Sequence, residues 1–410
     1  MISRAERTVV GEWWWTVDRL LLGALAALMI IGIVLALAAS PPVAARLGIA
    51  DPFHFVNRQV VFLLPALVVL IGTSFLSPRR IRRLALVLFF VFLSLLFATL
   101  VAGPEVKGAH RWLNIAGITV QPSEFLKPTF VIIAAWLFSE SVRRPEMPGQ
   151  LIAFGLLGVV ITPLVLQPDF GQTILISLVW GSLFFLAGLR IAAVFALGGI
   201  GAVGLLIAYH TVPHVAKRID RFMDPDSGSS YQIDVATDSF LHGGWLGQGP
   251  GEGTYKRILP DGHTDFIFAV AAEEFGALLC LMLLGLFAFI VLRALSHALR
   301  DEDPFVRFAV SGLAILFGLQ SAINMMVNLH LMPAKGMTLP FVSYGGSSLI
   351  SLAYGMGMLI ALTRRRPRSA TLAELERHSA GRARAKAAAS AAASAAASTP
   401  PAIPAPAPAA

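Results

Sequence analysis

Charged residues are scarce in this sequence. Only 14% of its 410 residues are Asp, Glu, Lys or Arg, and the mean hydropathy is +0.73. A soluble domain of this length carries far more charge, so a soluble globular protein is excluded. Cysteine is scarcer still. Cys280 is the only one, which excludes an intrachain disulfide.

Several kinds of site are also missing. No His/Cys cluster has the spacing of metal ligands, and the sequence contains no nucleophile elbow. Residues 247–253 are rich in glycine, but they lack Gly-Lys-Ser/Thr and follow no strand pattern, which excludes a nucleotide-binding loop. We expect these glycines to permit turns and close approach of backbones.

Long apolar blocks are what the sequence does contain. Blocks of 18 to 25 residues recur along it, which predicts an all-α polytopic membrane protein. The first block has no small-residue cleavage site and is expected to be a retained span rather than a signal peptide. The predicted spans number ten, at 20–39, 58–77, 82–102, 124–139, 150–167, 171–188, 190–211, 266–293, 304–331 and 344–363.

The arginines orient these spans. Although the net charge is +8, the basic residues lie in short loops beside apolar blocks, so they indicate topology rather than a nucleic-acid partner. With ten spans, the arginine-rich loops after every second span share one side with both termini, which is therefore predicted to be cytoplasmic. Residues 1–19 form a cytoplasmic arm, and 20–365 the membrane domain. Residues 366–410, rich in Ala, Ser and Pro, form a disordered cytoplasmic tail. A large external loop spans about 212–265, between the seventh and eighth spans.

Asp265 stands where this loop meets the eighth apolar block. A helix cap is the simpler interpretation, favoured by about two to one for an isolated Asp at a helix start. Its position at the external membrane surface favours catalysis, because a lipid-linked substrate presents its head group there. His263 and Asp265 can share a divalent ion, Mg²⁺ or Mn²⁺, with a diphosphate, but nothing in the sequence requires one.

Two further acids, Glu273 and Glu274, lie about 12 Å deeper on the same helix. We interpret them as buried structural acids paired with a cation from another span rather than as catalytic groups.

Glu124 and Lys127 are spaced to pair on one helix face at the start of the fourth span. A structural ion pair is the default interpretation, although charged residues inside a membrane are also candidates for function.

Cations on the external side run against the positive-inside rule. Lys107, His110, Arg111 and Lys335 belong either to solvated loops or to an anion site for phosphate. Asp169 is interpreted as a turn residue or cap. Gln320, Asn324 and Asn328 recur every four residues, so we expect one polar stripe that faces the bundle interior.

Several stretches resemble the SEDS proteins (shape, elongation, division and sporulation). They are residues 110–113 (HRWL), 121–127 (QPSEFLK), 167–171 (QPDFG), 243–249 (GGWLGQG), 260–269 (PDGHTDFIFA), 273–276 (EEFG) and 339–348 (LPFVSYGGSS). The matches run in order through nearly the whole membrane domain. Residues 333–340 look like the cell-division branch of the family rather than the elongation branch, which usually has Thr where Lys335 stands.

The resemblance implies a peptidoglycan glycosyltransferase in the bacterial inner membrane, at the division septum. It implies lipid II and undecaprenyl-diphosphate-linked glycan as substrates. It also implies a class B penicillin-binding protein and other divisome membrane proteins as partners, and Asp265 as the essential acid.

Together these observations give one mechanistic hypothesis, in which Asp265 is the general base. Arg111, Lys127, Lys335 and His263 bind the diphosphate. The supporting residues are Glu124, Asp169, Glu273, Glu274, Ser343 and Gly345.

Two other functions stay open at this point. A lipid II flippase would use intramembrane Glu and Lys residues, although the sequence shows no obvious internal repeat of the kind many transporters have. A divisome scaffold without chemistry would leave the costly external acids and bases unexplained.

Overall fold

A computed structural model describes residues 8–105, 109–115, 117–188, 191–211, 216, 219–220, 231–333 and 336–364 of the chain. The chain divides into two units, Met1–Arg364 and Arg365–Ala410. The predicted tail, Lys107 and Lys335 lie outside the described residues.

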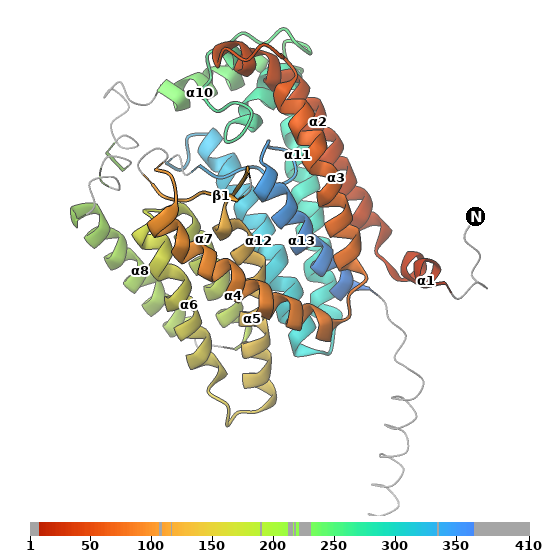
Figure 1. The fold of residues 1–410 in the computed structure, drawn as a ribbon, viewed down its shortest axis with the longest axis vertical. Coiled ribbons are helices and arrows are strands. Elements are labelled where there is room, and N and C mark those ends of the chain that lie inside the picture. The colour runs from red at the N-terminus through yellow and green to blue at the C-terminus, as the bar shows by residue number, and fades with distance from the viewer. Residues whose placement is uncertain are drawn as a thin grey trace, which may run out of the picture. The chain divides into compact units, whose positions relative to one another are not determined.

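The regular secondary structure of the described part is helical except for one short hairpin (Figure 1). Its strands β1 (Leu113–Ile115) and β2 (Ile118–Val120) are antiparallel, with Asn114 opposite Thr119. The α-helices are α1 (Val9–Thr16), α2 (Arg19–Arg46), α3 (His54–Ser74), α4 (Pro78–Ala102), α5 (Pro122–Arg143), α6 (Gly149–Leu166), α7 (Phe170–Leu186), α8 (Ile191–Thr211), α10 (Tyr231–Gly243), α11 (Ile267–Arg300), α12 (Pro304–Asn328) and α13 (Gly346–Thr363); η2 (Tyr255–Arg257) is a 3-10 turn.

The all-α polytopic fold is confirmed. Eight of the described helices are long and apolar enough to cross a membrane, and two shorter apolar helices lie at Phe170–Leu186 and Ala196–Thr211. A helix coincides with each of the ten predicted blocks. The count of ten spans and the cytoplasmic placement of both termini stay predictions. The external loop differs from expectation, because it contains α10 and η2, which its sequence did not predict.

Local sequence explains where several helices begin. Asp18 accepts hydrogen bonds from the first amides of α2, and Ser77 and Asp303 cap α4 and α12. A proline follows each of the latter two caps, where its missing N–H costs nothing.

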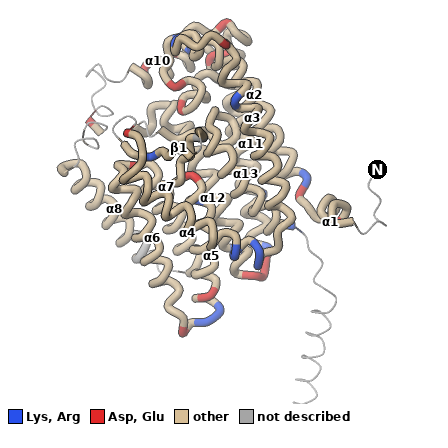
Figure 2. The backbone as a smooth tube through the Cα atoms, in the orientation of Figure 1, with Lys and Arg blue, Asp and Glu red and all other residues tan. Residues whose placement is uncertain are grey.

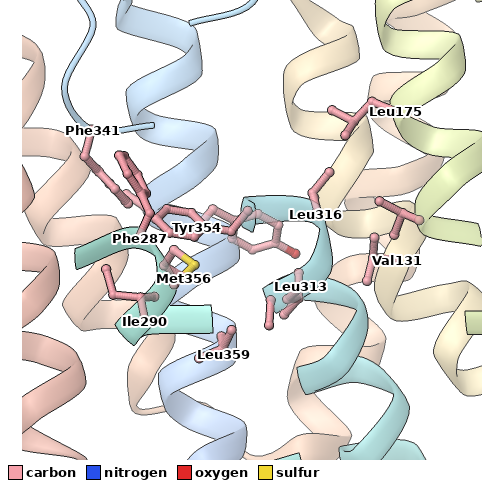
Figure 3. Close-up of a cluster of buried hydrophobic side chains, with 14 of the residues drawn as sticks. Val131, Leu175, Phe287, Ile290, Leu313, Leu316, Phe341, Tyr354, Met356 and Leu359 are labelled. Carbon is pink, nitrogen blue, oxygen red and sulfur yellow. The ribbon is translucent and has the colours of Figure 1, made fainter. Parts of the chain in front are cut away.

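Three helices form the centre of the bundle. In their most apolar stretch, 67% of α5, 72% of α12 and 78% of α13 is buried, against 22–44% in the other membrane-length helices. Buried side chains of α5, α7, α11, α12 and α13 belong to one hydrophobic cluster (Figure 3). Two of these helices carry the buried polar residues, Glu124 and Lys127 on α5 and the polar stripe on α12, which are thereby kept away from lipid.

Charged residues gather towards the two ends of the bundle, and the stretch between the ends carries few (Figure 2). This is the arrangement expected of helices that cross an apolar layer.

Helix α11 is interrupted at Gly276. Its φ of 76° and ψ of −177° are not helical and are open essentially to glycine alone. Each break in a membrane helix leaves backbone groups that lipid cannot satisfy. Here the loop after α10 supplies the partners: Ala277 and Leu278 donate to the carbonyls of Gly244 (2.9 Å) and Trp245 (3.3 Å).

The exchange is reciprocal. The amides of Gln248 and Gly249 donate to the carbonyls of Glu273 (2.9 Å) and Glu274 (3.1 Å). The two backbones approach so closely that a Cβ on Gly247 would lie 2.2 Å from the backbone carbonyl oxygen of Glu274. The expectation that the glycines of this loop permit close backbone approach is confirmed.

Replacing Gly276 tests whether this break is built into the fold. We expect Gly276→Ala to lower the thermal unfolding midpoint strongly. The left-handed backbone costs about 1–3 kcal/mol by itself, and the new Cβ would lie 2.4 Å from the Trp245 oxygen. Gly285→Ala is the control, because that helical glycine of α11 has nothing within 4 Å of its Cβ position. Equal unfolding midpoints for the two variants would contradict the conclusion that the fold requires glycine at the break in α11.

Candidate functional site

Asp265 lies in the turn that leads into α11. The N-cap residue of that helix is Phe266, whose side chain makes no capping bond. The amide of Ala269, which a capping side chain would normally satisfy, instead donates to Oδ1 of Asn328 at 3.1 Å. The cap is thus supplied from α12, and the capping interpretation does not explain Asp265.

Two asparagines of α12 fix the Asp265 backbone. The side-chain amides of Asn324 and Asn328 both donate to the Asp265 carbonyl at 2.9 Å. Asn324 also donates to the Met337 carbonyl at 2.6 Å. Both asparagines are buried. The predicted polar stripe of α12 therefore does face the bundle interior, where it joins the start of α11 to the loop before α13.

That loop is tied to the Asp265 turn at two further points. The hydroxyl of Ser343 donates to the Thr264 carbonyl (2.5 Å) and accepts from the Leu339 amide (2.8 Å). A Cβ built on Gly336 would lie 3.7 Å from Oδ2 of Asp265. The structure thus brings Ser343 and Asp265 together, and it places the Asp265 carboxylate beside the loop that carries Lys335.

His263 and Gly345 frame the same turn. The His263 ring lies 4.3 Å from that of Phe55 and 5.6 Å from that of Tyr344, and its carbonyl accepts from the Tyr344 amide at 2.9 Å. Gly345 is the N-cap residue of α13, in extended backbone that other residues also adopt. Its carbonyl accepts the Leu349 amide at 2.9 Å.

The predicted pair of Glu124 and Lys127 forms, with 2.9 Å between Oε1 and Nζ. Both are buried, and each has a second partner. Glu124 accepts from Gln172 at 2.8 Å, and Lys127 donates to Gln320 at 2.9 Å. Gln320 donates in turn to the Thr338 carbonyl at 3.3 Å. The ion pair is therefore linked through α12 to the loop beside Asp265.

Arg111 and Asp169 also meet, beside β1. The Arg111 guanidinium lies 3.6 Å from Oδ2 of Asp169 and donates to the Pro168 carbonyl at 3.1 Å. Asp169 caps α7 through the Gln172 amide, as its turn motif predicts. Burial raises the pKa of the Asp169 carboxyl above its ordinary value, against the opposing effect of the Arg111 charge.

Glu273 and Glu274 are fully buried and bind backbone amides of the loop between α10 and α11. Glu273 accepts from the amides of Tyr255 (2.6 Å) and Lys256 (2.8 Å), and Glu274 from those of Gly251 (2.5 Å) and Gly253 (3.3 Å). The Lys256 ammonium pairs with Glu274. These contacts favour a structural role for both acids, which stays a prediction. The prediction that their cation comes from another span was wrong, because it comes from the loop.

The metal hypothesis finds no complete donor set. Within the part of the chain that the structure describes, no three His, Cys, Asp or Glu side chains converge on one point. A divalent ion held by His263 and Asp265 would need its remaining ligands from elsewhere.

The sequence did not predict the contacts of two buried polar side chains, Lys256 and Gln172. Lys256 lies in a polar loop that has no helical or strand periodicity. Gln172 lies on α7 and belongs to no repeating polar pattern. Each acts through a partner distant in the chain, which a local pattern does not reveal.

A charge-removal series tests whether the buried pair is structural. We expect Lys127→Met to cost about 3–5 kcal/mol, because it strands a buried carboxylate. The double change Glu124→Gln/Lys127→Met should regain most of that loss. Arg143→Met is the control, since the Arg143–Asp303 pair is 40% and 44% exposed and should cost at most about 1 kcal/mol.

Thermal unfolding of the purified variants measures these differences. A Lys127→Met variant as stable as Arg143→Met would contradict a structural pair. A stable double variant that has lost activity would add a role in substrate binding.

Known proteins resemble this chain over most of its length. Residues 18–367 match the family of cell cycle proteins designated FTSW_RODA_SPOVE. The probable peptidoglycan glycosyltransferase FtsW of Caulobacter vibrioides is 46% identical over 365 residues, covering 89% of this chain and 94% of that protein. Its counterpart in Trichlorobacter lovleyi is 36% identical over 361 residues, covering 84% and 93%.

Solved structures agree. The rod shape determining protein RodA of Thermus thermophilus is 29% identical with a TM-score of 0.64, covering 86% of this chain and 99% of that one. A chain from a structure of a peptidoglycan synthase complex is 29% identical with a TM-score of 0.71, covering 85% and 97%. The resemblance drawn from the motifs is confirmed, and the chain belongs to the FtsW/RodA/SpoVE family of cell cycle proteins.

Proposed function

We propose that this integral inner-membrane protein is a peptidoglycan glycosyltransferase of septal wall synthesis, with Asp265 as its general base. Its curated relatives carry the name peptidoglycan glycosyltransferase FtsW, in agreement with the division-branch motif at 333–340. Lipid II is the proposed substrate, and the division septum the proposed location.

The observation that carries the role of Asp265 is the way its backbone is held. Two buried asparagines bind its carbonyl, and Ser343 binds the carbonyl before it. Asp265 itself is half-buried in the turn before α11, beside Gly336. A carboxylate that its neighbours hold in place at the end of a membrane-spanning bundle is suited to remove a proton from a lipid-linked substrate in the membrane.

In the proposed step, Asp265 takes the proton from the 4-hydroxyl of the GlcNAc of lipid II. That oxygen forms a bond to the anomeric carbon of the MurNAc at the end of the growing chain. The bond from this carbon to the diphosphate breaks with inversion, and undecaprenyl diphosphate leaves with the electron pair. A positioned base contributes on the order of 10²–10⁴-fold to such a step.

The leaving diphosphate gains negative charge, which cations aimed at it would stabilise. Arg111, Lys127 and Lys335 are the proposed cations, with His263 beside them. Arg111 and Lys127 already hold acidic partners in Asp169 and Glu124. Their proposed role therefore requires them to shift part of their hydrogen bonding from those partners to the diphosphate.

A crosslinking partner completes the proposal. A neighbour in fold comes from a structure described as coordinating polymerization and crosslinking in a peptidoglycan synthase complex. We propose a class B penicillin-binding protein as the partner of this chain, together with other membrane proteins of the divisome.

Lipid II polymerisation by the purified chain with its transpeptidase tests the proposal. We expect Asp265→Asn to lower the rate about 10²–10⁴-fold, because the amide cannot accept the proton. The control is Glu252→Gln, an exposed acid of the external loop, which should polymerise like wild type.

Thermal unfolding confirms that both variants are folded, and a parallel reaction with chelator shows any dependence on a divalent ion. Undiminished polymerisation by Asp265→Asn would refute its role as the base. Translocation of labelled lipid II in liposomes without polymer would instead favour the flippase.

A further inference from the structure

Three large apolar side chains at the end of α10 and in the loop directly after it are highly exposed. Leu241, Trp245 and Leu246, which we call the apolar loop tip, are 73%, 74% and 79% exposed. Residues 239–251, which surround the tip, include no Asp, Glu, Lys or Arg. An uncharged stretch with three such side chains is unlike a loop surface that faces water.

The backbone of the tip is joined to the lipid-facing side of α11. The Leu278 amide donates to the Trp245 carbonyl at 3.3 Å, and the Ala277 amide to the Gly244 carbonyl at 2.9 Å. Leu278 is also the first exposed residue of α11, since everything before it is buried or half-buried. The tip therefore begins at the level where α11 emerges from the protein.

Beyond that level α11 presents apolar side chains outward. Leu278, Leu281 and Met282 are 61%, 54% and 52% exposed on a helix apolar enough to cross a membrane. In a membrane-spanning helix such side chains face lipid. The apolar loop tip is hydrogen-bonded to α11 at Leu278, where this exposed apolar surface begins.

We infer that the apolar loop tip is embedded in the outer leaflet of the bilayer, with Trp245 near the boundary between acyl chains and head groups. Tryptophan favours that boundary because its ring is apolar and its N–H is polar. The polar side of the loop stays in the protein, where Glu273 and Glu274 bind its amides.

This anchoring sets the height of Asp265, a consequence that rests on the proposed function. From its first residue, Ile267, to the break at Gly276, α11 rises roughly 14 Å, and Asp265 lies in the turn just before Ile267. With the tip at the acyl boundary, Asp265 stands outside the hydrocarbon core, at the height where a lipid-linked diphosphate carries its sugars. The embedding itself does not depend on the reaction, so its test is independent of activity.

Depth-dependent quenching tests the inference directly. Because Cys280 is the chain's only cysteine, Cys280→Ala gives a background in which one new cysteine carries one environment-sensitive fluorophore. Leu241→Cys and Leu246→Cys report on the tip. Leu281→Cys is the lipid-facing reference, and Glu252→Cys is the exposed polar control on the same loop.

The labelled full-length proteins are reconstituted into phosphatidylcholine–phosphatidylglycerol vesicles, with or without lipids that carry a nitroxide near the head group or deep in the chain. We expect the shallow nitroxide to quench the fluorophore at Leu241→Cys and Leu246→Cys. The quenched fraction should be about as large as that at Leu281→Cys with whichever nitroxide quenches that position more strongly. Glu252→Cys should lose little to either. Thermal unfolding verifies that each variant is folded.

Tip positions that behave like Glu252→Cys would overturn the inference. The inference would also be overturned if neither nitroxide quenched the fluorophore at the tip positions but addition of the transpeptidase changed its emission. That result would assign the tip to a protein partner. Either failure leaves the polymerisation test of Asp265 unaffected.

Discussion

The backbone of α11 needs hydrogen-bond partners where the helix breaks at Gly276, and the fold of the loop between α10 and α11 depends on how those partners are supplied. Lipid offers no partners, so the loop after α10 enters the break and exchanges four hydrogen bonds with it. Glu273 and Glu274 then hold the rest of the loop by its amides. The carboxylates avoid an uncompensated charge because the amides and Lys256 surround them.

The same need for partners explains the site. Asn324 and Asn328 lie in the most protected part of the bundle, where an unpaired amide would be costly. They find their acceptors in the Asp265 and Met337 carbonyls, and so join two loops that are distant in the chain. The network reaches Glu124 and Lys127 through Gln320. Gln320 also binds the Thr338 carbonyl, next in the chain to the Met337 carbonyl that Asn324 binds, so the ion pair and Asp265 are attached to the same loop.

Patterns of residues predicted the elements better than their partners. The apolar blocks located the membrane helices, and four-residue spacing predicted the polar stripe of α12. The i, i+3 spacing predicted the pair of Glu124 and Lys127. The stripe could not reveal that it binds the Asp265 carbonyl, because that contact joins residues 59 and 63 positions apart. Nor could one glycine in an apolar run show that α11 breaks there. Helix α10 was missed because the glycines that follow it favour a loop over the whole segment.

In the proposed mechanism Asp265 removes a proton in the transition state, rather than only placing a negative charge near the substrate. The pH dependence of single-turnover glycosyl transfer distinguishes the two, because a base must be unprotonated to act. In wild type the rate should fall with unit slope as the pH drops below the pKa of the essential carboxylate. The residual rate of Asp265→Asn should lack this acidic limb. An acidic limb that persists unchanged in Asp265→Asn would contradict the account, because another group would then be the base.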